Sequence, residues 1–169
     1  MSARTFQTDV LSSQVAEALA YGATLGELRG YTDEECEGVY VLGHRSYANA
    51  RYLDALKAFG FLVMNNPYER RFVRAYASTL HMLMRYEDAI AYYSMASAMD
   101  MRDPVPTFHT AECLLALRMV AEAKQALGFV ESQCTQPHQM ALKERAMALL
   151  KLLSTPSRER EESNGGLHG

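Results

Sequence analysis

The sequence reads YLDALKAF at residues 52–59, YEDAIAYY at 86–93 and VAEAKQAL at 120–127. These three stretches align without gaps at a constant spacing of 34 residues. The same step aligns small residues at two positions of each unit: Gly43, Ala77 and Ala111, then Ala55, Ala89 and Ala123. A 34-residue period is typical of a repeated helix–turn–helix unit. Three copies in one register are stronger evidence than any single short motif, so the pattern predicts an all-α fold.

Close packing of helices explains why each repeat carries small residues at these positions. Two antiparallel helices approach closely only where small side chains meet at the crossing. Larger neighbours, Leu42 and Phe59 among them, are expected to fill the space beside that crossing. Period and packing together predict a helical solenoid of three tetratricopeptide repeats (TPRs). The glycine that often separates the two helices of a repeat is absent, and this turn position holds Ala50, Met84 and Arg118.

The repeats divide the chain into predicted regions. We set the three repeats at 36–69, 70–103 and 104–137, and TDEE (32–35) has the pattern of a capping box that opens the first. Residues 1–35 form an N-terminal segment with a helix over 9–20. A helix over 138–153 is expected to cap the last repeat. The composition of 154–169 predicts a disordered tail.

Composition narrows the classes of function. The net charge of −3 gives no electrostatic reason to expect a nucleic acid or an anionic membrane surface as partner. The first 20 residues lack the apolar stretch of a secretory signal, and the run FGFLVM (59–64) is too short to span a bilayer. Three widely spaced cysteines without a CxxC pair fit a reduced, cytoplasmic protein.

One stretch, FHTAECLL (108–115), offers a possible metal site, because His109, Glu112 and Cys113 share one helical face. Zinc needs three or four such ligands. Repeat register gives a simpler interpretation, in which Cys113 is a small buried residue between repeats. The sequence shows no phosphate-binding loop, GxSxG or HExxH. We therefore expect no enzyme activity, no catalytic residue, no metal and no cofactor.

In a TPR solenoid, the concave groove lined by the first helix of each repeat is the binding surface. Repeat positions 2, 5, 9, 12 and 13 predict the following peptide-binding residues: Tyr40, His44 and Tyr47 in the first repeat, Arg71, Arg74, Ser78, His81 and Met82 in the second, and Phe108, Glu112 and Leu115 in the third. Aromatic rings suit apolar anchors of an extended peptide, and polar groups can fix its backbone.

Residues 22–127 resemble the class II chaperones of bacterial type III secretion, which guard pore-forming translocator proteins. The resemblance rests on three stretches: GATLGEL (22–28), VYVLGHRSYANARYLDALKAF (39–59) and AIAYYSMASAMDMRDPVPTFHTAECLLAL (89–117). It implies a cytoplasmic chaperone, without enzyme activity, that keeps hydrophobic translocators soluble. Each client is expected to lay an extended segment containing proline and leucine in the groove.

The resemblance also implies particular residues and an oligomer. The family's groove aromatics match Tyr40, Tyr47 and Phe108, and Tyr52 matches a further tyrosine of the pattern. Family members often dimerise through the N-terminal helix, which implies a homodimer in the client-free state. The expected dimer interface comprises Leu11, Val15, Ala18 and Leu19.

A generic TPR adaptor for another peptide partner is the alternative. Adaptors that hold a carboxylate at the C terminus of their partner carry Lys and Asn at repeat positions 5 and 9. In the first repeat these positions hold Tyr40 and His44, so that clamp is missing.

Overall fold

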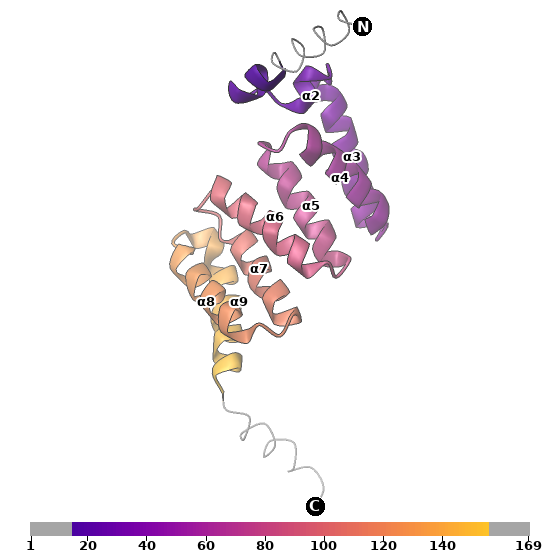
Figure 1. Cartoon of the computed structure of the whole chain (residues 1–169). Coiled ribbons are helices and arrows are strands. Elements are labelled where there is room, and N and C mark those ends of the chain that lie inside the picture. Colours follow the sequence, from indigo (N-terminus) through magenta and orange to yellow (C-terminus); the bar gives the residue numbers. More distant parts are fainter. Residues whose placement is uncertain (1–14, 156–169) are drawn as a thin grey trace, which may run out of the picture. The chain divides into compact units, whose positions relative to one another are not determined.

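The computed structural model describes residues 15–155, and all of their regular secondary structure is helical. The prediction of an all-α fold is therefore confirmed. The chain divides into two compact units, Met1–Met84 and Arg85–Gly169 (Figure 1). The predicted tail, apart from its first two residues, lies outside the described part of the chain, and so does the first half of the predicted helix over 9–20.

The first unit holds a helical segment at 15–20, and four further helices follow it. They are α2 (Leu25–Leu28), α3 (Asp33–Ala48), α4 (Tyr52–Asn65) and α5 (Arg70–Met82). Helices α3 and α4 pack as a hairpin, and α5 packs on α4. The second unit holds α6 (Tyr86–Met99), α7 (Val105–Ala116), α8 (Val120–Gln133), the 3₁₀ turn η1 (Pro137–Gln139) and α9 (Met140–Ser154). Each α-helix of this unit packs on the next.

Helix starts follow local sequence signals. The predicted capping box is present: the Thr32 side chain accepts from the backbone N–H of Glu35, whose carboxylate accepts from the Thr32 N–H at 2.9 Å. The backbone hydrogen bond from Thr32 lowers the pKa of Glu35. A second capping box, Thr24 with Glu27, opens α2, which the sequence analysis did not predict. Both boxes supply partners for N–H groups that the first helical turn leaves unpaired.

The small residues of the repeat lie where the sequence places them. Ala55, Ala77, Ala89, Ala111 and Ala123 are all fully buried. Gly43 is buried as well, and a Cβ atom there would lie 2.6 Å from Cε1 of Phe59. The expectation for Leu42 was wrong, because 58% of this residue is exposed. It stands in the first repeat, where no earlier repeat covers its helix.

The three turn positions without glycine adopt a left-handed backbone. The φ angles are 57° at Ala50, 58° at Met84 and 62° at Arg118. At the end of α3, Arg51 N–H donates to the Ser46 carbonyl and Ala50 N–H to the Tyr47 carbonyl, which is the hydrogen-bond pattern of a Schellman motif. Residues other than glycine pay a steric penalty in this region. Packing of the flanking helices therefore imposes the turn.

A buried asparagine fixes the N-terminal segment to the first hairpin. Asn65, fully buried at the end of α4, donates to the carbonyl of Phe61 at 2.7 Å and accepts from Arg29 at 3.1 Å. The Asn65 backbone packs on Gly26 of α2, where a Cβ atom would lie 3.1 Å from the Asn65 carbonyl oxygen. The segment before α3 is thus held in place by a buried polar contact as well as by apolar packing.

Candidate functional site: an aromatic pocket in the first unit

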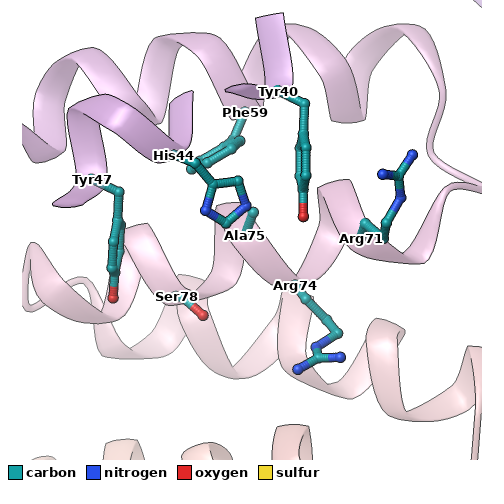
Figure 2. Close-up of a pocket in the computed structure, with 8 residues that line it drawn as sticks. All are labelled: Tyr40, His44, Tyr47, Phe59, Arg71, Arg74, Ala75 and Ser78. Carbon is teal, nitrogen blue, oxygen red and sulfur yellow. The ribbon is translucent and has the colours of Figure 1, made fainter. Parts of the chain in front are cut away.

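A pocket of about 300 Å³ opens in the first unit. Helix α3 contributes Tyr40, His44 and Tyr47, which lie on one face of the helix because they recur at helical spacing. The remaining lining residues come from α4 and α5: Phe59, Arg71, Arg74, Ala75 and Ser78. Figure 2 shows that the rings from α3 project toward the side chains of α5. Six of the predicted peptide-binding residues therefore line one pocket.

Aromatic contacts hold the upper wall of the pocket in place. The Tyr40 and His44 rings lie edge to face with centroids 4.4 Å apart, and His44 meets Phe59 in the same way at 5.2 Å. Tyr40 also contacts Phe72 of α5 at 5.4 Å. Only 1% of Phe59 is exposed, so its ring provides a rigid base for the other two. Such pairs favour a fixed arrangement of rings before any ligand arrives.

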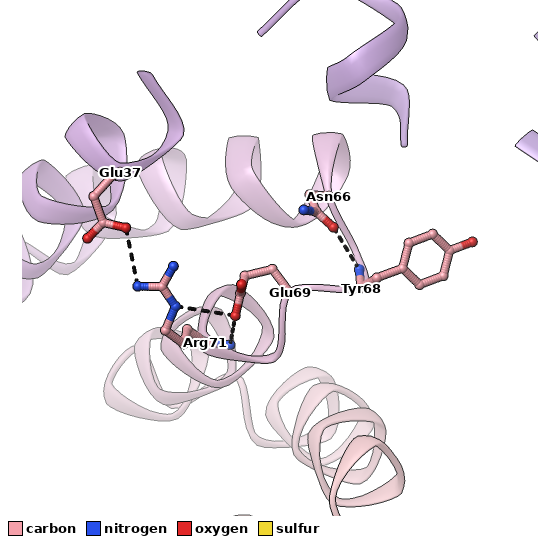
Figure 3. Close-up of polar contacts among 5 residues, drawn as sticks. All are labelled: Glu37, Asn66, Tyr68, Glu69 and Arg71. Carbon is pink, nitrogen blue, oxygen red and sulfur yellow. Dashed lines mark hydrogen bonds and ion pairs between the residues drawn. The ribbon is translucent and has the colours of Figure 1, made fainter. Parts of the chain in front are cut away.

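Arg71 closes one side of the pocket and is held from two directions (Figure 3). Its guanidinium pairs with Glu37 of α3 at 3.2 Å and with Glu69 at 3.3 Å. The guanidinium carbon lies 5.0 Å from the centroid of the Tyr40 ring. Glu37 and Arg71 are 34 residues apart and occupy the same position in successive repeats. This ion pair fastens the start of α5 to α3.

The phenols of the pocket are shielded but keep free hydroxyl groups. Burial raises the pKa of Tyr40, and the nearby Arg71 opposes this only in part. Burial also raises the pKa of Tyr47, with a smaller contribution from Tyr52, whose ring centroid lies 5.4 Å away. Within residues 15–155, no hydrogen bond reaches either hydroxyl. Both phenols stay protonated near neutral pH and can donate to a ligand.

The other predicted residues of this unit lie outside the pocket. Tyr52 supports Tyr47 from the start of α4 without lining the pocket. His81 is half-buried near the end of α5, and Met82 is 46% exposed. The sequence analysis had treated Phe59 as a packing residue and had not named Ala75, yet both line the pocket. Repeat register identifies the outward positions of the first helices but gives no signal for the floor beneath them.

In the second unit, the prediction for Phe108 does not agree with its surroundings. The ring is 1% exposed and belongs to a core cluster. The cluster also contains Ala111, Leu127, Val130, Cys134 and Ala146. Arg145 of α9 lies over the ring with 4.7 Å between its guanidinium carbon and the ring centroid. In this structure Phe108 is a core residue, and its part in peptide binding stays a prediction.

Glu112 connects two helices of the second unit. One oxygen of its carboxylate lies 2.7 Å from Nδ1 of His109, and the other lies 3.5 Å from the guanidinium of Arg145. The His109 ring also stacks on Tyr93 of α6 at a centroid distance of 5.3 Å. Leu115, the third predicted residue of this repeat, is half-buried. Glu112 thus joins α7 to the capping helix α9.

Cys113 does not share a site with His109 and Glu112. It is fully buried, and it belongs to no group of potential metal ligands within residues 15–155. Burial, with a smaller contribution from Glu112, raises the pKa of the Cys113 thiol from 9.0 to about 12. Nucleophilic attack by a cysteine needs the thiolate, which this shift makes scarce near neutral pH. The residue therefore behaves as a buried packing group, as the repeat register suggested.

The predicted dimer interface is described only in part. Val15 and Leu19 are 41% and 42% exposed on the helical segment at 15–20, and Ala18 is half-buried. Leu11 lies outside the described residues. Within the described part of the chain, no helix has both the length and the apolarity needed to cross a bilayer.

Comparison with known proteins identifies relatives of one kind. The chain is 31% identical over 127 residues to the Low calcium response locus protein H of Yersinia pestis, a match that covers 75% of this chain and 76% of that protein. No family model matches the chain. The structure is similar to that of SycD, a type III secretion translocator chaperone of Yersinia enterocolitica. That match has a TM-score of 0.70 and 30% identity, and it covers 78% of this chain and 98% of SycD.

Some of the similar structures contain bound peptides. PcrH of Pseudomonas aeruginosa, in complex with the chaperone binding region of PopD, matches with a TM-score of 0.70 and 31% identity. This match covers 74% of the chain and 95% of PcrH. SycD has also been solved with a peptide of the translocator YopD and as an alternative dimer.

Proposed function

Because this chain belongs to the translocator chaperones of type III secretion, we propose that it binds hydrophobic translocator proteins and keeps them soluble before secretion. The observation that carries the proposal is the pre-formed aromatic pocket of the first unit. PcrH and SycD, which have similar structures, each hold a translocator segment. The chain is therefore a binding protein of a chaperone family, and we place it in the bacterial cytoplasm.

The pocket suits one anchor residue of an extended segment. Its rings present apolar faces beside hydroxyl and imidazole groups, a combination that binds a side chain and fixes the neighbouring backbone. Because the rings are packed against Phe59, little side-chain entropy is lost when a client binds. We assign Tyr40, His44 and Tyr47 as client-contacting residues, with Phe59 as the floor beneath them.

A test of this function is co-expression of the chain with a candidate translocator of a type III secretion system. We expect a soluble complex with the unchanged chain. The double variant Tyr40→Ala, Tyr47→Ala removes two walls of the pocket and should leave most of the client insoluble. Tyr68→Ala is the matched control, because Tyr68 is 64% exposed and its ring points away from Arg71 in Figure 3. An insoluble client beside the unchanged chain would reject the proposed function.

We also propose that the client-free chain forms a homodimer through its N-terminal helix. Val15 and Leu19 supply exposed apolar side chains for that contact. Light scattering of the purified chain should give the mass of a dimer, and Leu19→Asp should shift it to the mass of a monomer. A dimer that persists in Leu19→Asp would place the interface elsewhere.

A further inference from the structure

We propose that His44 donates a hydrogen bond to a main-chain carbonyl of the client segment, and that this contact sets the register of the segment in the pocket of the first unit. This inference rests on the proposed function, because it assumes that a client segment lies in the pocket. It names an atom of the client that the pocket recognises whatever side chains the segment carries.

The charged groups around the pocket already interact within the chain. The guanidinium of Arg71 pairs with Glu37 and Glu69, so its charge is matched at the edge of the site. Arg74, the other arginine of the lining, also has an interaction partner in the chain. The charges of the lining therefore give no reason to expect an ionic anchor, and an uncharged partner suits the pocket better.

The polar groups that α3 contributes to the pocket lack hydrogen-bond partners. Within residues 15–155, no hydrogen bond reaches the imidazole of His44 or the hydroxyls of Tyr40 and Tyr47. Water can serve these groups while the pocket is open. A client that covered them with apolar side chains alone would leave them unpaired, which costs free energy. The client must therefore supply polar atoms at this point.

The main chain of an extended segment supplies such an atom at every residue. Each residue, proline included, carries a carbonyl oxygen that accepts hydrogen bonds, and this oxygen does not depend on the side chain. It also brings no charge into the aromatic pocket. An imidazole carries a donor N–H whether it is neutral or protonated. The imidazole of His44 and a client carbonyl are thus complementary.

The position of His44 suits this contact. Figure 2 shows its ring between Tyr40 and Tyr47, with both ring nitrogens on the side directed away from α3. The ring packs edge to face on Tyr40 at a centroid distance of 4.4 Å and on Phe59 at 5.2 Å. These contacts orient the donor before the client arrives, so little entropy is lost on binding. One oriented donor between two aromatic walls can hold a segment at one place along its length.

The test weakens one carbonyl of the client at a time. The probe is the chaperone binding region of PopD, the segment that the similar protein PcrH holds. Fluorescently labelled versions of this peptide carry a single thioamide, in which sulfur replaces one main-chain oxygen, at each position in turn. Sulfur is the weaker acceptor, whereas the N–H group and every side chain are kept. Fluorescence polarisation gives a dissociation constant for each peptide with the unchanged chain and with variants of His44.

We expect one position at which the thioamide weakens binding about threefold to tenfold. His44→Phe keeps the ring packing and should remove this sensitivity, whatever it does to the affinity itself, so the two changes form a double-mutant cycle. His44→Gln retains an N–H donor and should restore part of the sensitivity. His138→Phe is the matched control, since this exposed histidine lies on η1 of the other unit. Circular dichroism confirms that each variant is folded.

The outcomes separate this inference from the chaperone function. A thioamide effect that survives His44→Phe, or no effect at any position, would overturn the hydrogen bond from His44 and leave the chaperone function standing. A sensitivity that is lost in Tyr47→Phe and kept in His44→Phe would assign the donor to the phenol instead. If the PopD peptide does not bind while co-expression gives a soluble client, the inference also fails, because a main-chain contact should tolerate a related segment. Failure of the peptide to bind, together with an insoluble client, would reject both proposals.

Discussion

The guanidinium of Arg71 lies 5.0 Å above the ring of Tyr40 while two carboxylates, those of Glu37 and Glu69, hold it in place. The contact joins α5 to α3 across the mouth of the pocket. One arginine thus orients a ligand-facing ring and fastens two helices. Its energetic contribution is expected to be smaller than the number of contacts suggests, because Arg71 and Glu37 are both half exposed.

A double-mutant cycle tests this expectation. Arg71→Ala and Glu37→Ala, alone and combined, should give a coupling free energy of about 0.2–1 kcal/mol in urea unfolding. Solvent screens the pair, so the coupling should shrink further at high salt. A coupling well above that range would show that the pair is a main determinant of stability in this unit.

Gly43→Ala should destabilise the first hairpin. A Cβ atom there would lie 2.6 Å from Cε1 and 2.9 Å from Cδ1 of the Phe59 ring, which is buried and cannot swing away. Overpacking of this kind costs about 1–3 kcal/mol. Gly128→Ala is the control, because a Cβ atom at this α8 position meets nothing within 4 Å. That change should raise the free energy of unfolding, by up to about 1 kcal/mol. A neutral Gly43→Ala would mean that α3 and α4 can separate at little cost.

Ala50→Gly should stabilise the protein. Ala50 holds a left-handed backbone with φ of 57°, which costs a residue with a Cβ atom about 1–2 kcal/mol. Glycine removes that strain but loses about 0.5–1 kcal/mol through its more flexible unfolded state. We expect a small net gain in the free energy of unfolding, measured by urea titration. Ala91→Gly, at an exposed position within α6, should instead lose about 1 kcal/mol. Equal losses at both sites would contradict the strain argument.

Phe108→Ala should unfold the second unit more readily. The ring is 1% exposed within a cluster that includes Leu127 and Val130, and removal of such a side chain costs about 3–5 kcal/mol. The measurement is the midpoint of thermal unfolding followed by circular dichroism. Tyr40→Phe, which removes only a hydroxyl, should leave that midpoint nearly unchanged. A Phe108→Ala variant that stays stable but binds the client more weakly would show that Phe108 contacts the client.

Cys113 should resist thiol reagents in the folded protein. Its pKa of about 12 leaves almost no thiolate at pH 8, and burial blocks access. Ellman's reagent should modify it only after denaturation, as mass spectrometry of the labelled peptide can verify. Above pH 9 the unfolded thiol ionises before the folded one, so the free energy of unfolding should fall as the pH rises toward 12. Rapid modification of Cys113 at pH 8 without denaturant would show that its surroundings open readily.

The repeated elements were predictable because each depends on local sequence. The 34-residue spacing predicted which small residues lie at the helix crossings. The capping box of Thr32 and Glu35 predicted the start of α3. The register also identified the pocket residues of α3, since Tyr40, His44 and Tyr47 share one face of that helix. Such signals describe one helix at a time and do not require knowledge of its neighbours.

The residues whose burial differs from what the repeat register suggests lie in the first and the last repeat. Phe108 occupies the same repeat position as Tyr40, and from the sequence the two rings look equivalent. Tyr40 lines an open pocket, whereas Phe108 belongs to a cluster on which Leu142 and Leu149 of α9 pack. Leu42 shows the opposite effect, because its helix lacks a preceding repeat. Burial at these positions depends on which helix comes next, and periodicity carries no information about that.

The capping helix α9 makes a contact of a kind that also occurs in the first unit, in which an arginine packs on a ring and pairs with a glutamate. There an arginine of α5 lies over an aromatic ring of α3 and is held by a glutamate of α3: Arg71, Tyr40 and Glu37. In the second unit the corresponding set is Arg145, Phe108 and Glu112. Helix α9 thus attaches to the last repeat by a contact of the type that joins helices of the first unit. A new 34-residue module that carries its own ring and glutamate could be inserted before α9 without altering that helix, so the number of modules is a quantity that evolution or a designer can change.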